Sequence, residues 1–282
     1  MSVGLVLEGG AMRGMYTAGV LDVFMDHNIP VDGIVGSSAG VLFGVNYPSR
    51  QRGRVIRYNK KYAKDPRYMG MRSLLTTGNI VNKDFAYYTV PLKLDVFDQK
   101  TFEQSGTDFY ATITNMETGE PEYVKLRNLF DEMEILRATS AMPLVSKIVE
   151  IDGKKYLDGG IADSIPVEKC RELGYDKIIV VLTRPLDYRK KPVKPMPYKI
   201  AYKKYPNFVK TVLNRYKNYN DTVERIIDME NKKEIFVIRP SRLVDVKRIE
   251  RDENKLQEMY DLGVEDCNRC MEALLAYLGI ES

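Results

Sequence analysis

The sequence contains a single histidine, His27, among 282 residues. Histidine is the usual proton acceptor for a catalytic serine, so this scarcity restricts the hydrolytic mechanisms open to the chain. A nucleophilic serine would have to use His27 or work without histidine.

Other shortages exclude further classes of protein. No run of 18 apolar residues occurs, so the sequence predicts no transmembrane helix. Met1–Leu7 leads directly into a predicted strand, so we expect no signal peptide. Only three cysteines are present, without a disulfide framework, which favours the reducing cytoplasm. A net charge of only +4 and the lack of a recognition motif argue against a nucleic-acid partner.

Cys267 and Cys270 form a C-x-x-C pair, which can indicate a metal or redox site. No second ligand pair accompanies them, so zinc binding is not supported. They continue a stripe of residues spaced by three and four positions, which predicts the buried face of a helix. We therefore expect core cysteines and no metal site; the stripe also contains Leu256, Tyr260, Gly263, Leu274 and Leu278.

Strand and helix patterns alternate up to about Leu182, which predicts an α/β fold with a mostly parallel sheet and helices on both faces. With 44% hydrophobic residues, the chain can bury a full core. The predicted strands are Val3–Leu7, Gly33–Gly36, Phe109–Thr114 and Lys177–Leu182, with a hairpin of Ile148–Ile151 and Lys154–Leu157 around the Asp152-Gly153 turn.

The turn Gly36-Ser37-Ser38-Ala39-Gly40 lies between a short apolar strand and a helical stretch from Ala39 to Tyr47. In this strand-turn-helix context, G-x-S-x-G places a serine on a tight, exposed elbow. Ser38 is therefore the candidate nucleophile, with Gly36 and Gly40 shaping the turn. Ser37 is the nearest rival, but the variable position of the elbow points elsewhere.

The predicted topology places His27 far from this serine. The helix Met15–His27 starts above the first strand and descends for about 12 residues, or about 18 Å. His27 then lies near the start of the second strand, whereas Ser38 lies at its end. We interpret His27 as a polar residue at a helix C-terminus, where the partial negative charge suits it.

A glycine cluster, Gly9-Gly10-Ala11-Met12-Arg13-Gly14, follows the first predicted strand. It could be a dinucleotide-binding loop, but Ala11 replaces a required glycine and Asp32 is a poor match for the acidic partner. It could also be only a tight turn. Adjacent parallel strands, however, bring this loop beside Ser38, and its backbone N–H groups could bind an anion. We favour an oxyanion hole.

Asp158-Gly159-Gly160 follows the predicted hairpin. Two glycines after an aspartate allow the backbone to turn sharply, so the carboxylate could project into a site. Asp-Gly turns are also common without any catalytic role, as Asp152-Gly153 illustrates. The residues alone leave both interpretations of Asp158 open.

In this order, the three motifs resemble those of the patatin-like phospholipase family. Ala138–Pro143 and Ile165–Val167 look like that family as well, and the resemblance covers roughly residues 1–185. It implies a patatin-like three-layer sandwich and a Ser-Asp dyad without histidine or cofactor. Ser38 would be the nucleophile and Asp158, in the Asp-Gly-Gly motif with Gly159 and Gly160, the proton acceptor. The oxyanion hole would comprise Gly9, Gly10, Ala11, Met12, Arg13 and Gly14.

The sequence departs from the family at Ala11, where the family often has a third consecutive glycine. This difference affects the geometry of the backbone N–H donors in the loop. Arg13 could hold a substrate phosphate or brace the loop, and the sequence does not distinguish these roles. A dyad is chemically reasonable because a partly desolvated carboxylate gains proton affinity and can activate a serine hydroxyl.

The sequence thus predicts a cytoplasmic serine hydrolase that cleaves acyl esters of phospholipids or lysophospholipids through a covalent acyl-enzyme. One alternative is an esterase or thioesterase acting on soluble acyl substrates. Another is a phosphate-binding module built on residues 9–14, which leaves Ser38 and Asp158 unexplained.

We expect residues 1–185 to form the catalytic domain, with residues 51–106 as a helical insertion over the site. Residues 186–282 would form a mainly helical C-terminal extension on the same core, including a strand at Glu234–Ile238 and a closing helix at 253–278. Its first part, Arg189–Phe208, is basic and rich in tyrosine. This stretch could be a solvated surface or could contact anionic lipid headgroups at a membrane.

Overall fold

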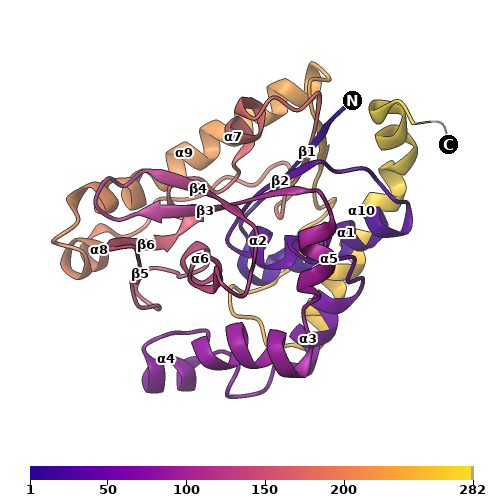
Figure 1. Ribbon diagram of the computed structural model, residues 1–282. Helices are drawn as coiled ribbons and strands as arrows, with labels where there is room; N and C mark the ends of the chain where they lie inside the picture. Colours follow the sequence, from indigo (N-terminus) through magenta and orange to yellow (C-terminus); the bar gives the residue numbers. More distant parts are fainter. Residues whose placement is uncertain (281–282) are drawn as a thin grey trace.

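The computed structural model describes residues 1–280 of the chain, and its centre is an eight-stranded sheet (Figure 1). Hydrogen bonds join the strands in the succession β5-β6-β3-β2-β1-β7-β8. Strand β4 pairs with one edge of β3, and β2 and β6 pair with successive parts of the other edge. Strands β3, β2, β1, β7 and β8 are parallel neighbours, whereas β4, β5 and β6 pair antiparallel. The strands are β1 Val3–Leu7, β2 Gly33–Ser37, β3 Asp108–Asn115, β4 Pro121–Leu126, β5 Val149–Ile151, β6 Lys154–Asp158, β7 Lys177–Val181 and β8 Phe236–Ile238.

Both faces of the sheet are covered, which explains why the central strands are continuous apolar runs. Alternate residues of β1 enter different clusters: Leu5 and Leu7 pack on one face and Val6 on the other. The first face is covered by α1 Met15–Asp26, α2 Ala39–Gly44, α6 Met133–Thr139 and α10 Glu253–Leu278, and the second by α7 Val167–Glu172 and α9 Pro206–Asn231 (Figure 1).

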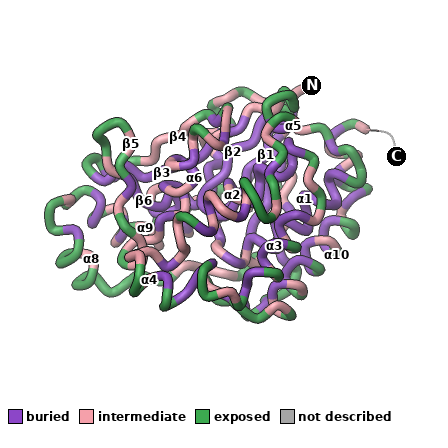
Figure 2. The backbone as a smooth tube through the Cα atoms, turned by 60° about the horizontal axis from the view of Figure 1, so that its bottom comes forward, coloured by how far each residue is buried: buried purple, intermediate pink, exposed green. Residues whose placement is uncertain are grey.

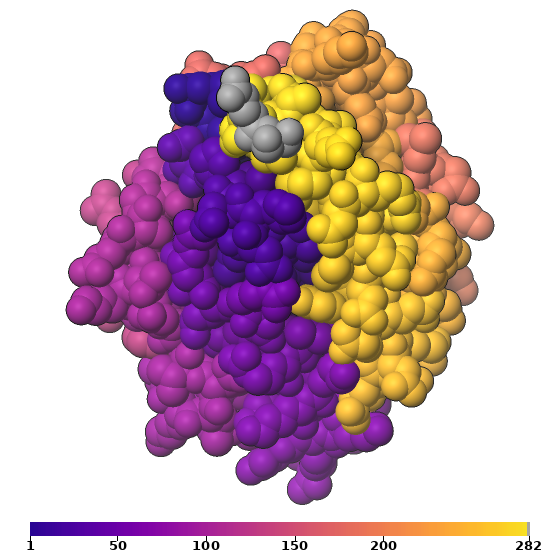
Figure 3. Space-filling view, turned by 90° about the vertical axis from the view of Figure 1, so that its right-hand side faces the viewer, coloured from indigo at the N-terminus to yellow at the C-terminus, as the bar shows by residue number. Residues whose placement is uncertain are grey.

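On the first face, α1 and α10 cross at a glycine contact. A Cβ at Gly19 would collide with the carbonyl oxygen of Tyr260, and one at Gly263 with that of Tyr16. The two backbones therefore approach each other closely. Figure 3 shows the result on the surface, where the yellow α10 lies against the indigo N-terminal segment.

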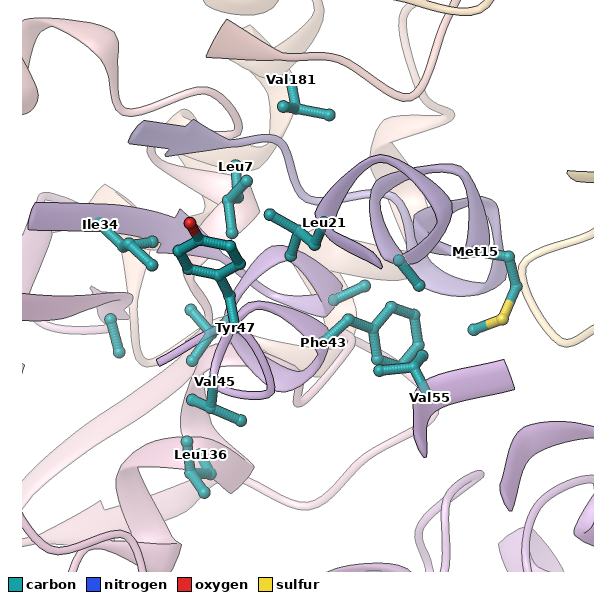
Figure 4. Packing of buried hydrophobic residues seen from close by; sticks show 14 of the residues in the cluster. Leu7, Met15, Leu21, Ile34, Phe43, Val45, Tyr47, Val55, Leu136 and Val181 are labelled. Carbon is teal, nitrogen blue, oxygen red and sulfur yellow. The ribbon is translucent and has the colours of Figure 1, made fainter. Parts of the chain in front are cut away.

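Between these helices and the sheet lies a dense apolar core (Figure 4). Leu7 and Ile34 of the strands meet Leu21 of α1 and Phe43 of α2 there. The hydroxyl of Tyr47 reaches the carbonyl oxygen of Ile29, so the polar end of this buried ring is satisfied. This packing holds the residues that follow β1 and β2 in fixed positions.

Residues 51–106 form a helical segment of α3 Arg54–Tyr62, α4 Met71–Thr77, the π-helix η2 Lys83–Leu94 and α5 Gln99–Gln104. In Figure 1, α3 and α4 lie below the first face, whereas α5 lies higher, at the level of α1. Tyr62, Tyr68 and Phe85 contact one another edge to face within this segment.

The residues after 185 share the main sheet, because β8 pairs in parallel with β7. The short α8 Pro195–Ala201 contains no buried residue, and its tube is mostly green in Figure 2. The assignment of residues 1–185 and 186–282 to separate domains stays a prediction.

The fold class predicted from the sequence is confirmed, and the predicted bounds of β1 and α10 match the structure. The helix expected over 39–47 ends earlier, at Gly44, and continues as turns. Strand β4 was not predicted. It begins at Pro121 and its first four residues are only half-buried, so it lacks the apolar alternation of a core strand.

Candidate active site

Ser38 lies at the sharp turn between β2 and α2. Its backbone has φ 53° and ψ −122°, a conformation that L-residues rarely adopt. Gly40 makes the turn possible, because a Cβ there would collide with the carbonyl oxygen of Leu7 at the end of β1. Strain of this kind persists only where the surroundings impose it, and it concentrates at functional sites.

The pairing of β3 explains how Asp158 reaches this turn. Thr114 of β3 pairs with Pro121 of β4 on one edge and with Leu157 of β6 on the other. Strand β6 therefore lies on the same edge of β3 as β2, and the ends of β2 and β6 meet. Ser37 is opposite Thr112, and Asp158 is opposite the next residue, Ile113.

At this meeting point the Ser38 hydroxyl donates a hydrogen bond of 2.9 Å to Oδ2 of Asp158. The N–H of Gly160 donates to the other carboxylate oxygen, Oδ1, at 2.8 Å. Gly159 permits the turn between them, since a Cβ there would collide with the carbonyl oxygen of Thr112. Both serine and aspartate are buried.

Burial raises the pKa of Asp158, because an ionised carboxylate loses hydration inside the protein. The charge of Arg215 and the hydrogen bonds from Gly160 and Ser38 oppose this shift. The net direction is upward, so the carboxylate binds a proton more readily than an exposed aspartate does.

Thr139 and Thr112 hold the backbone of Ser38 in place through two successive hydrogen bonds. The Ser38 N–H donates to Oγ1 of Thr139 at 2.9 Å, and this hydroxyl donates to the carbonyl oxygen of Thr112 at 2.6 Å. Thr139 ends α6, so this bond connects the elbow to a third element. Thr139 belongs to the family-like segment Ala138–Pro143, but its residue type and position in the sequence gave no sign of this contact.

The glycine cluster forms the loop after β1 and the 3₁₀ turn η1 Ala11–Gly14. The N–H of Gly9 donates to Ser164, that of Met12 to Arg248 and that of Arg13 to Gly10. Within residues 1–280, the N–H groups of Gly10 and Ala11 have no acceptor. Both residues line a cavity together with Ser38. Among the six residues of this loop, Gly10 and Ala11 therefore have backbone N–H groups free to bind an anion in that cavity.

Ala11 adopts φ 49°, in the left-handed region. Glycine adopts this conformation without steric cost, whereas alanine pays about 1 kcal/mol or more. Ala11 stands where the family often has a third glycine, and in this structure it keeps the left-handed backbone conformation that a glycine would adopt.

Ser38 opens into two cavities. The first has a volume of about 140 Å³ and is mainly apolar. Its walls come from α2, from residues 51–106 and from α6. They include Leu42, Phe43, Tyr58, Tyr68, Met69, Val81, Tyr87, Val90, Phe97, Phe130, Met133 and Leu136.

The second cavity, of about 630 Å³, is lined by the glycine loop, Asp158 and a group of cations. These cations are Arg13, Arg184, Arg189, Lys190, Lys191, Arg215 and Arg248. Most come from residues after 185. The sequence singled out the basic stretch Arg189–Phe208 there only as a solvated or lipid-contacting surface, and it gave no sign of Arg215 or Arg248. Glu8 also lines this cavity, but it already accepts from the Thr183 N–H at 2.6 Å and the Tyr219 hydroxyl at 2.8 Å.

His27 does not belong to this arrangement. It is exposed at the C-terminal end of α1 and lines neither cavity. Cys267 is buried against α1, and Cys270 packs partly buried beside it. Across residues 1–280, no group of three or more His, Cys, Asp or Glu residues is arranged to hold a metal ion. In that same range, no helix combines the length and apolarity required to span a bilayer.

Two family models match separate parts of this chain. Residues 5–171 match the model of the family described as "Patatin-like phospholipase", and residues 205–279 match a "Domain of unknown function (DUF6363)". The uncharacterized protein YjjU of Escherichia coli (strain K12) is 30% identical over 273 residues, which covers 93% of this chain and 74% of YjjU.

Two further similarities are more limited. The lysophospholipase nte1 of Aspergillus fumigatus is 30% identical over 190 residues, covering 64% of this chain but only 12% of that protein. The crystal structure of VipD from Legionella pneumophila aligns with a TM-score of 0.43 and 12% identity, over 95% of this chain and 67% of VipD. Because the patatin-like model matches more than half of its residues, this chain belongs to the patatin-like phospholipase family.

Proposed function

We propose that the protein is a serine hydrolase that cleaves acyl esters of lipids, with Ser38 as nucleophile and Asp158 as proton acceptor. One observation carries this proposal: the 2.9 Å hydrogen bond from the Ser38 hydroxyl to Asp158, at a strained elbow between an apolar and a basic cavity. Membership of the patatin-like phospholipase family and the similarity to lysophospholipase nte1 support the lipid substrate.

The reaction follows from these positions. The Ser38 oxygen attacks the ester carbonyl carbon while its proton passes to Oδ2 of Asp158. The negative charge on the carbonyl oxygen is stabilised by the N–H groups of Gly10 and Ala11. The tetrahedral intermediate then collapses, and Asp158 returns the proton to the departing alkoxide oxygen. Water attacks the acyl-serine in the same way and releases the fatty acid.

The apolar cavity is the natural site for the acyl chain. Its volume of about 140 Å³ is close to the ~150 Å³ of an engineered apolar cavity that binds benzene. As it stands, it holds only the part of a chain nearest the carbonyl. Residues 51–106 supply much of its wall.

Labelling with a fluorophosphonate tests the reaction class, because the probe modifies only activated serines. We expect labelling of the wild type at Ser38, and release of fatty acid from lysophospholipids and phospholipids in a chain-length panel. Activity on short soluble esters without activity on lipids would favour the soluble-ester alternative. An unlabelled, folded wild type would contradict a serine hydrolase altogether.

We also propose that α8 contacts an anionic membrane. Met196 and Ile200 are 61% and 68% exposed on it, and lysines flank them. Apolar side chains beside lysines suit the interface of an anionic bilayer, and each lysine near its surface contributes about 1 kcal/mol.

Replacing four exposed lysines with glutamine should therefore weaken binding to vesicles that contain anionic lipid, measured by co-sedimentation. These are Lys194, Lys199, Lys203 and Lys204. The control variant replaces four exposed lysines elsewhere: Lys100, Lys217, Lys232 and Lys233. An equal loss in both variants would show a general charge effect and refute a specific role for α8.

A further inference from the structure

Four cations from separate parts of the chain converge on the second cavity: Arg13, Lys190, Arg215 and Arg248. Arg13 lies in η1, and Arg215 on α9. The loop of Lys190 is fixed to α9 by two hydrogen bonds with Asn220, at 2.8 and 3.1 Å. The carbonyl oxygen of Arg248 accepts from the N–H of Met12. The fold therefore holds all four backbones in place.

These four cations outnumber the acidic groups of the cavity, Glu8 and Asp158. Among the residues that the structure describes, none of the four makes an ion pair. The buried Nε atoms of Arg13 and Arg215 have no hydrogen-bond acceptor within residues 1–280. The acidic groups of the cavity, Glu8 and Asp158, are occupied by the hydrogen bonds described above.

Burial and the neighbouring positive charges both disfavour the charged form of Lys190. Burial, together with the charges of Arg215, Arg248 and Arg13, lowers its pKa to about 6, although Glu8 opposes the shift. Burial likewise lowers the pKa of Arg13 to about 10. Partly desolvated charges without partners are unfavourable, so Lys190 gives up its proton readily in this cavity. A bound anion would stabilise the charged form of Lys190 and of the arginines. Arginine and lysine are the side chains that bind phosphate oxygens most strongly.

The position of the cavity identifies the anion. In a lysophospholipid or phospholipid, a short glycerol linker separates the acyl ester from the phosphate. With the ester carbonyl at Ser38 and the chain in the apolar cavity, the phosphate falls in the basic cavity that Ser38 also lines. We propose that Arg13, Lys190, Arg215 and Arg248 form a subsite for the lipid phosphate and select headgroups of net negative charge over zwitterionic or uncharged ones. This inference rests on the proposed function.

The same cavity disfavours a headgroup with a quaternary ammonium. Such a group is bound by aromatic faces or carboxylates. Four tyrosines line this cavity, Tyr188, Tyr198, Tyr216 and Tyr219. The rings of Tyr219 and Tyr188 already carry Lys190 and Arg184, at 4.2 and 4.3 Å. The other cations of the cavity repel the positive charge of such a headgroup. Selection of anionic headgroups therefore arises from this repulsion as well as from attraction to the phosphate.

Kinetics on matched lysolipids test the selectivity. The readout is the ratio of kcat/KM for an anionic glycerol headgroup over a choline headgroup with the same acyl chain. Removing one charged hydrogen-bond donor costs about 1.5–3 kcal/mol, so Lys190→Gln and Arg248→Gln should each lower this ratio about tenfold or more. Lys217→Gln, an exposed lysine of α9 outside the cavity, is the control and should leave the ratio unchanged. An unchanged ratio in both cavity variants would overturn the proposal.

A binding measurement separates this inference from the proposed hydrolase activity. Calorimetry with Ser38→Ala compares inorganic phosphate, glycerol 3-phosphate and the anionic lysolipid. We expect all three to bind, the lysolipid most tightly, and Arg248→Gln to weaken each. If both phosphates bind but the lysolipid binds no better, the subsite serves a free phosphate, and the headgroup assignment is wrong. If Ser38→Ala binds phosphate but the wild type hydrolyses no lipid, the hydrolase proposal is refuted and the anion site stands. If the wild type hydrolyses lipid but Ser38→Ala binds no phosphate, the anion site alone is refuted.

Discussion

Ser38→Ala is expected to abolish ester hydrolysis and fluorophosphonate labelling, and Asp158→Asn to lower kcat by about 10⁴-fold or more. Losses of this size follow when a nucleophile or its base is removed from a unit that acts together. The asparagine keeps the shape of the side chain, but it cannot accept the proton that the 2.9 Å hydrogen bond positions for transfer. Steady-state hydrolysis of a short ester measures both effects.

His27→Gln is the matched control, because His27 is exposed at the far end of α1. It should retain most of the activity. Circular dichroism and thermal unfolding establish that all three variants are folded. A folded His27→Gln protein without activity would contradict the histidine-free mechanism.

The same dyad sets the acid limb of the pH profile. Only the ionised Asp158 accepts a proton, so kcat/KM should fall as the pH decreases through its pKa. Since burial raises this pKa, the fall should occur at higher pH than for an exposed aspartate. Arg215 opposes the shift, so Arg215→Gln should move the acid limb to still higher pH.

Gly10→Ala should lower kcat about 10²–10³-fold, the usual effect of losing one oxyanion donor. A Cβ at this position would lie 2.7 Å from Oγ1 of Thr183 and 2.9 Å from its Cγ2, so the loop must shift. The shift displaces the N–H groups of Gly10 and Ala11, whereas the acyl cavity keeps its walls. KM should therefore change much less than kcat.

Thr183→Ala provides the internal check on this explanation. It removes the two closest atoms and leaves the backbone N–H that donates to Glu8. The double variant should recover part of the lost kcat. A double variant as slow as Gly10→Ala alone would show that displacement of the loop by Thr183 is not the cause.

The sequence by itself determined the features that depend on short segments. Apolar runs ending in glycine turns identified β1 and β2, and the spacing of Gly36, Ser38 and Gly40 identified the elbow, because a turn is decided by a few consecutive residues. Residue spacing also defined α10 and its buried Cys267, whereas Cys270 is only partly buried. The scarcity of histidine, with the order of two βα units, was enough to exclude His27 from the predicted mechanism.

The tertiary structure decided what depends on contacts between distant segments. Ser38 and Asp158 are 120 positions apart, and they meet only because β6 joins the same edge of β3 as β2. No local pattern encodes that choice of edge. The support from Thr139 and the basic cavity arise in the same way, since Lys190, Arg215 and Arg248 reach the site through the packing of α9 and two loops. Local sequence sets turns and faces, whereas register and packing over long separations set which side chains share a cavity.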